Sequence, residues 1–243
     1  CLGLSGSIQQ TIIDSIQKIK IHLLPINEAI EMVEQGFKEQ GNGTGVNLPR
    51  ERAQAGNMGV TMMVAALGER GVSGFKAMGA GKPLVLLYGG EPRQLLAVME
   101  AGSLGQIRTG AASGVATRYM AREDASSVGI IGTGNQAITQ LSAVCAVRTI
   151  LTIKAYSRTP ERREEFCRTM SDSLGIQVSP VSTAQEAIQG ADIAIAITNV
   201  RTLDPVLLGD WLEPGMHINA AGANSLVRRE LDDAAVRRCS IIA

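Results

Sequence analysis

Short apolar runs alternate with helical patterns in the second half of the chain, from Ser126 onward. The apolar runs are bounded by turn residues, and between them apolar residues recur every three or four positions. The predicted strands are residues 128–131, 151–156, 193–198 and 216–220, with a short one at Val178, and the predicted helices are residues 136–147, 160–174 and 183–189. This alternation is typical of βαβ units, so we predict an α/β fold with a doubly wound parallel sheet, of the Rossmann type.

The first half has a different pattern. A helix is predicted after Pro25, over residues 26–40, with Ile30, Val33 and Phe37 on its buried face. Glycine-separated strand-like runs then follow at residues 60–66, 72–78, 84–88 and 94–99. Their spacing predicts an antiparallel sheet and therefore an α+β domain.

A long helix is predicted over residues 103–122, where the two patterns meet. Small side chains follow one another in it, which allows close helix packing: Ala111, Ala112, Ser113, Gly114 and Ala116. We place the domain boundary here, with a first domain over residues 1–112 and a second over residues 113–243. Residues 239–243 resemble the opening of a further strand, so we expect the chain to be C-terminally truncated and the second domain incomplete. Residues 1–20 carry an isoleucine stripe at helical spacing and are left unassigned.

Composition excludes several classes of protein. Lys+Arg and Asp+Glu both number 23, without a basic stretch, and aromatic residues make up only 3%. We therefore expect no nucleic-acid partner. No apolar run approaches membrane-spanning length, so we expect no membrane partner. Four scattered cysteines without metal-ligand spacing, and an N-terminus without a signal pattern, indicate a cytoplasmic protein without a metal site.

A glycine motif directly follows the first parallel strand. Gly132 allows a tight turn, Gly134 leaves room for a pyrophosphate against the backbone, and Ala137 lets helix and strand pack closely. The free N–H groups at the helix start favour phosphate. An ordinary strand-to-helix turn is the alternative, but the strand–glycine–helix context favours a dinucleotide site. The residues assigned to cofactor binding here are Gly132, Thr133, Gly134, Asn135, Gln136 and Ala137.

The end of the second parallel strand bears on the choice of cofactor. NAD-specific sites place a carboxylate there for the ribose 2′-hydroxyl, whereas this chain has Ser157, Arg158 and Thr159. A cation and two hydroxyls suit a 2′-phosphate. NADP(H) is therefore favoured and NAD(H) stays possible; the alternative is that Arg158 is a solvated surface residue.

Four segments together resemble the ornithine cyclodeaminase/μ-crystallin family. They are LPINEAIEMVE from Leu24, QIRTGAASGVATRY from Gln106, SVGIIGTGNQA from Ser127 and PGMHINAAG from Pro214. The resemblance implies an NAD(P)-binding domain and a substrate domain whose sheet pairs with a second subunit. It also implies chemistry at the C–N bond of a small amino or imino acid.

The resemblance further implies roles for single residues. Lys76 matches the family's active-site lysine, although on composition alone a solvent-facing lysine is equally expected. An arginine pair holds the substrate carboxylate, here Arg108 and either Arg50 or Arg52, of which Arg52 has the better spacing to Lys76. Asn224 stands where cyclodeaminases have an aspartate base, and an amide cannot accept that proton. Thr109, in the family's Arg-Thr pair, is a candidate cofactor contact. Thr198 is another, because it ends the fourth parallel strand, whereas His217 is interpreted as a packed structural histidine.

We therefore expect an NAD(P)(H)-dependent oxidoreductase of the ketimine reductase or amino-acid dehydrogenase type, with Lys76 as acid and base. Two alternatives stay open: an NAD-dependent ornithine cyclodeaminase that releases ammonia, and a non-catalytic NADP(H)-binding, crystallin-like protein. The first-half strands are apolar on too many faces for a free-standing sheet. We expect a homodimer through this sheet.

Overall fold

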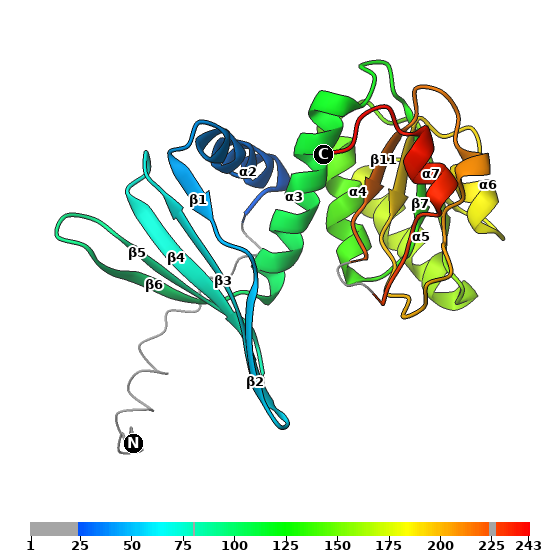
Figure 1. The fold of residues 1–243 in the computed structure, drawn as a ribbon. Coiled ribbons are helices and arrows are strands. Elements are labelled where there is room, and N and C mark those ends of the chain that lie inside the picture. The colour runs from blue at the N-terminus through cyan, green and yellow to red at the C-terminus, as the bar shows by residue number, and fades with distance from the viewer. Residues whose placement is uncertain (1–23, 80, 224–226) are drawn as a thin grey trace. The chain divides into compact units, whose positions relative to one another are not determined.

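The computed structural model describes residues 24–79, 81–223 and 227–243 of the chain, which forms two compact units (Figure 1). The first unit contains Glu31–Gly105 and the second contains Ile26–Ile30 together with Gln106–Ala243. Both share the helices α2 and α3, which begin in one unit and continue in the other. The expected boundary at residue 112 stays a prediction beside this division.

The first unit is built on a six-stranded antiparallel sheet. The strands run in the order β1-β3-β4-β5-β6, and β2 also pairs with β3. Their bounds are Gly45–Asn47 for β1, Glu51–Ala55 for β2, Met58–Leu67 for β3, Val72–Met78 for β4, Leu84–Gly89 for β5 and Gln94–Glu100 for β6. The four longest match the predicted runs, because glycines and turns separate segments of strand-forming residues.

Helix α2, Ile26–Gly41, buries different side chains from those that its sequence indicated. Ile30 is fully buried, but Phe37 is 51% exposed, and Glu39 is buried instead. Glu39 is satisfied there, since its carboxylate accepts hydrogen bonds from Arg70 Nε and from the backbone N–H of Glu69. Apolar spacing alone could not reveal this tether to the β3–β4 turn.

The second unit contains a five-stranded parallel sheet, in the order β11-β10-β7-β8-β9. Its strands are β7 at Ser127–Ile131, β8 at Thr152–Tyr156, β9 at Val178–Pro180, β10 at Ile193–Ala196 and β11 at His217–Ala220. Its helices are α3 at Gly102–Met120, α4 at Asn135–Val147, α5 at Pro160–Leu174, α6 at Ala184–Ile188 and α7 at Asp233–Arg238, with a 3₁₀ turn η2 at Gly209–Trp211. The predicted doubly wound α/β fold is confirmed.

The central strands of this sheet are buried on both faces. Every residue of β10 is buried, and Val128, Ile130 and Ile131 of β7 are at most 2% exposed. Continuous apolar strands of this kind need helices on both sides of the sheet. Close packing of α3 against α4 supplies part of that cover, because a side chain at Gly110 would collide with the Thr139 carbonyl.

Several elements differ from the prediction. Strands β1 and β2 and helix α7 were not expected. Strand β2 could not be recognised because it is exposed along its whole length and carries no apolar pattern. Residues 239–243 form no strand, so the strand expected there is wrong; Ile241 and Ile242 are exposed and pair with no neighbour. Residues 1–20 and Asn224 lie outside the described residues. Within the described part, no helix is long and apolar enough to span a membrane.

Candidate functional site

The site is built at the carboxyl edge of the parallel sheet. Strands β7 and β10 are neighbours, but the chain leaves β7 toward β8 on one side and leaves β10 toward β11 on the other. Connections that diverge in this way open a crevice at the strand ends, which is where open α/β sheets bind ligands. Gly132 follows β7 and Thr198 follows β10, so both lie at this switch point.

Gly132 and Gly134 serve the turn in different ways. Gly132 has φ +109°, and a side chain there would collide with the carbonyl of Ile197. Only glycine therefore fits, and it brings the end of β7 against the end of β10. Gly134 is the N-cap of α4 and has ordinary extended backbone, and a Cβ added there would meet nothing beyond its chain neighbours within 4 Å. Ala137 is fully buried, as close helix–strand packing requires.

The open space at Gly134 lies at the first turn of α4, and no capping side chain satisfies the helix N-terminus there. Free N–H groups and the helix dipole favour an anion at such a position. Asn135 is exposed in the same turn, and Gln136 has its Oε1 buried without a hydrogen-bond partner. A buried acceptor of this kind is uncommon and fits a ligand that donates a hydrogen bond. The residues present therefore fit a dinucleotide.

The end of β8 joins this turn through hydroxyl groups. The side chains of Thr133 and Ser157 are hydrogen-bonded to each other, with their oxygens 2.8 Å apart. Arg163 donates to the Ser157 carbonyl and lies over the ring of Tyr156. Arg158 is exposed beside them, free to reach a charged group in solvent. Thr159 is the N-cap of α5, so a second helix start faces this end of the sheet.

Glu230 is a residue that the sequence interpretation missed. Its side chain is buried, with 3% exposed, and its carboxylate accepts four hydrogen bonds. Oε1 accepts from the backbone N–H and the hydroxyl of Thr198, at 2.6 and 2.7 Å. Oε2 accepts from the N–H groups of Gly222 and Ala223, at 2.6 and 3.0 Å. One carboxylate thus joins the ends of β10 and β11, a link over 32 residues of chain that no local spacing could signal.

The first unit carries the predicted substrate-side residues on one face of its sheet. Arg52 pairs with Thr61, and Lys76 pairs with Met63. Directly paired residues share a face and so do residues two apart, so Arg52 and Lys76 point to the same side. Arg50 shares that face, and its guanidinium contacts the Met63 sulfur. Both arginines are exposed, so the choice between them stays a prediction.

Lys76 is only partly exposed, and its ammonium group lies beside the first turn of α3. A side chain added at Gly105 would come within 2.9 Å of Lys76 Nζ. This position sets Lys76 apart from Lys82 in the same sheet, whose side chain is 74% exposed and pairs with Glu100.

Arg108 and Thr109 lie in α3 within the second unit. Arg108 is exposed, whereas Thr109 is partly buried, and its carbonyl accepts a hydrogen bond from Gln140 Nε2 at 3.1 Å. Gln140 is fully buried in α4, so this bond fixes α3 against the helix that begins at the glycine turn.

The amino edge of the same sheet has a different character. Asp192, before β10, accepts hydrogen bonds from the N–H groups of Ser126 and Ser127 and pairs with Arg122. The Ser126 N–H is the main reason that the pKa of this carboxyl lies below its usual range. His217 at the start of β11 is 6% exposed, and burial lowers its pKa. These contacts are structural, as was expected for His217.

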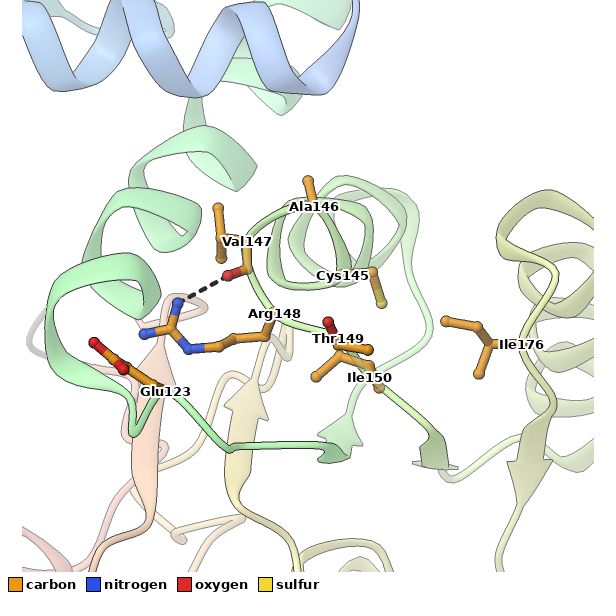
Figure 2. A pocket seen from close by; sticks show the side chains of 8 residues that line it. All are labelled: Glu123, Cys145, Ala146, Val147, Arg148, Thr149, Ile150 and Ile176. Carbon is orange, nitrogen blue, oxygen red and sulfur yellow. Dashed lines mark hydrogen bonds between the residues drawn. The ribbon is translucent and has the colours of Figure 1, made fainter.

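Two pockets lie at this amino edge. One of about 500 Å³ is shown in Figure 2, and its walls include Cys145 and Arg148. Arg148 donates to four backbone carbonyls, three of them at the end of α3, so most of its hydrogen-bonding capacity is used within the protein. Burial raises the pKa of the Cys145 thiol to about 11, which leaves it unreactive. The other, of about 520 Å³, is lined in part by His217 and Arg238. Neither contains a residue assigned to the cofactor.

No metal site accompanies these residues: in residues 24–79, 81–223 and 227–243, no group of three or more His, Cys, Asp or Glu could hold an ion.

Comparison with known proteins gives consistent matches. The model of the ornithine cyclodeaminase/mu-crystallin family matches residues 9–243. The Thermococcus litoralis Delta(1)-pyrroline-2-carboxylate reductase, solved with NADH and L-proline, is 36% identical with a TM-score of 0.81, over 89% of this chain and 70% of that one. An archaeal alanine dehydrogenase dimer with bound NAD is 30% identical, also with a TM-score of 0.81, over 89% of this chain and 69% of that one.

Among curated sequences, the Delta(1)-pyrroline-2-carboxylate reductase of Bacillus cereus is 42% identical over 147 residues. That match covers 60% of this chain and 43% of the relative. The chain thus spans less than half the length of this relative.

Proposed function

The chain belongs to the ornithine cyclodeaminase/mu-crystallin family, and from this premise we propose that it is an NADP(H)-dependent oxidoreductase acting on the C–N bond of a small amino or imino acid. The observation that carries the proposal is the switch point of the parallel sheet, where a glycine without a side chain leaves the uncapped start of α4 open. The relatives named above bind NADH with proline and NAD, which agrees with this site.

The second unit would hold the dinucleotide. The start of α4, from Gly134 to Gln136, would bind the pyrophosphate through backbone N–H groups. Arg158, with Ser157 and Thr159 beside it, would bind a ribose 2′-phosphate, which supports NADP(H) over NAD(H). When bound, the nicotinamide supplies a hydride donor or acceptor to the substrate carbon.

The chain's own side chains would hold the substrate and move the proton. Arg52 and Arg108 would bind its carboxylate, which arginine can grip with two parallel hydrogen bonds. Lys76 would donate a proton to the substrate nitrogen during reduction and accept it in the reverse direction. Asn224 would contact the substrate without acting as a base, and this favours the oxidoreductase over the ammonia-releasing cyclodeaminase.

We further propose a homodimer formed through the antiparallel sheet. Several apolar side chains of this sheet are exposed in the single chain, among them Met58, Leu95 and Leu96 at 70%, 50% and 46%. Exposed apolar patches on a sheet mark interaction surfaces. The similar alanine dehydrogenase is a dimer, which supports a dimeric state for this chain.

Turnover of the reduced cofactor with a panel of cyclic imino acids, including Δ1-pyrroline-2-carboxylate, tests the activity. NADPH oxidation that depends on an imino acid supports the proposal. Release of ammonia and proline from ornithine would indicate the cyclodeaminase instead. Cofactor binding without turnover of any amino or imino acid would indicate the non-catalytic binding protein.

A further inference from the structure

The hydroxyl of Thr198 donates its proton to a hydrogen bond within the protein. It lies 2.7 Å from Oε1 of Glu230, a buried carboxylate that meets four donors. An ionised carboxylate can only accept hydrogen bonds, so the Thr198 hydroxyl must be the donor. Its remaining hydrogen-bonding capacity is the lone pairs on Oγ1, which can only accept.

The other contacts of Glu230 are with donors as well. Three of its four partners are backbone N–H groups, from Thr198, Gly222 and Ala223, which cannot accept a hydrogen bond in return. All four contacts are therefore satisfied when both carboxylate oxygens act as acceptors. Space around the carboxylate is also tight, because a side chain at Gly222 would collide with it and with the Thr198 carbonyl. The group is therefore fixed in one orientation.

Thr198 is in turn placed at the switch point. It lies two residues beyond the end of β10, next to the Gly132 turn, and it is partly exposed whereas the five residues before it are buried. A ligand in the crevice thus meets an oxygen that accepts hydrogen bonds and cannot donate one. The nicotinamide ring carries a carboxamide whose NH₂ group is a donor of matching kind.

We propose that Glu230 is a positioning residue that makes Thr198 an obligate acceptor for the carboxamide NH₂ of the nicotinamide. This rests on the proposed cofactor function and deepens it. The alternative is that Glu230 only ties the ends of β10 and β11 together, in which case the Thr198 hydroxyl contributes nothing to the ligand.

The two cases are separated by an analogue. In 3-acetylpyridine adenine dinucleotide phosphate a methyl group replaces the carboxamide NH₂, and the rest of the molecule is retained. Thr198→Val removes the hydroxyl at nearly constant shape, and Thr198→Ser is the matched control that retains it. Calorimetry on the full chain measures the binding of three ligands: NADPH, the reduced analogue and adenosine 2′,5′-bisphosphate.

We expect Thr198→Val to weaken NADPH binding roughly three- to tenfold, the value of one hydrogen bond, and Thr198→Ser to stay within twofold of the parent. The analogue and the adenosine bisphosphate should bind both variants like the parent. Equal losses for NADPH and the analogue, or no loss for either, would overturn the inference.

Glu230→Gln tests the positioning role itself. An amide matches at most two of the four donors, so either the turn at Gly222 loses its acceptor or the Thr198 hydroxyl is released from its donor role. We expect NADPH binding to weaken more than analogue binding while the adenosine bisphosphate is unaffected. If Glu230→Gln does not fold, the comparison of Thr198→Val with Thr198→Ser decides whether the Thr198 hydroxyl accepts from the carboxamide. If the parent binds neither NADPH nor the adenosine bisphosphate, the cofactor function fails and the inference with it; if it binds both and no variant discriminates, only the inference fails.

Discussion

The two sheets of this chain treat their side chains in opposite ways. In the parallel sheet, β10 is buried at every position and β7 at all but its first. In the antiparallel sheet, β2 is exposed throughout, and no residue of β3, β4 or β6, all of which are described, is fully buried. The parallel sheet is covered by the helices of its own unit, whereas the antiparallel sheet presents apolar side chains that the described residues leave partly exposed. A sheet whose strands are buried on both faces can hold binding residues in fixed positions. A sheet with exposed apolar side chains offers a surface to which another molecule can bind.

The largest expected effect separates two lysines of the antiparallel sheet. Lys76→Met should lower turnover about a hundred- to ten-thousand-fold, because proton-transfer catalysis is worth that much. NADPH affinity should be retained, since the glycine turn belongs to the parallel sheet. Lys82→Met is the matched control, because Lys82 is exposed and paired with Glu100. Steady-state kinetics beside cofactor titration checks both variants, and parent-like turnover in Lys76→Met would leave the mechanism without its acid.

A second prediction concerns the uncovered apolar surface. Leu95→Glu places a charge on the antiparallel sheet, and burying an unpaired charge in an interface costs several kcal/mol. We expect the dimer to dissociate at concentrations where the parent is dimeric, as measured by light scattering. Leu151→Glu is the control in the second unit, where Leu151 is 69% exposed, and it should leave the mass unchanged. A parent that is monomeric at high concentration argues against the interface.

A third prediction tests how completely the parallel sheet is buried. Burial lowers the pKa of His217, so the unfolded chain binds a proton more readily than the folded one. Stability should therefore fall as pH drops below about 6.5, with a slope of at most about 1.4 kcal/mol per pH unit for this one group. Denaturant unfolding between pH 7.5 and 5 measures it. His217→Gln should flatten the slope; an unchanged slope would show that His217 is not its source.

The smallest effect is expected at the exposed end of β8. Arg158→Ala should weaken NADPH about tenfold or less and leave NADH within twofold, because only the 2′-phosphate loses a partner. Arg162→Ala, on the exposed face of α5, is the control cation. Parallel calorimetric titrations give the answer, and equal NADPH and NADH affinities in the parent would remove the basis for NADP(H) preference.

The sequence predicted the elements whose signals are local. Continuous apolar runs marked β7 and β10, and the glycine motif marked the turn at Gly132 because its fit depends on neighbouring residues. Strand β2 was missed, since it is held by pairing with β3 rather than by its own pattern. Glu230 was missed for a related reason: its partners are Thr198 and a turn next to β11, brought together only by the fold. Phe37 shows the converse, an apolar residue at helical spacing that is exposed.

The most direct test of the central claim, that the switch point of the parallel sheet binds a dinucleotide, is calorimetric titration of NADPH into Gly134→Val. A Cβ added at Gly134 has no heavy atom beyond its chain neighbours within 4 Å, and the backbone there is ordinary and extended, so the fold should be unchanged. It would, however, fill the space in which the pyrophosphate approaches the start of α4. Gly36→Val, at another glycine with open space, is the control. We predict at least hundredfold weaker NADPH binding in Gly134→Val with a parent-like melting temperature; parent-like binding in that variant would contradict the account.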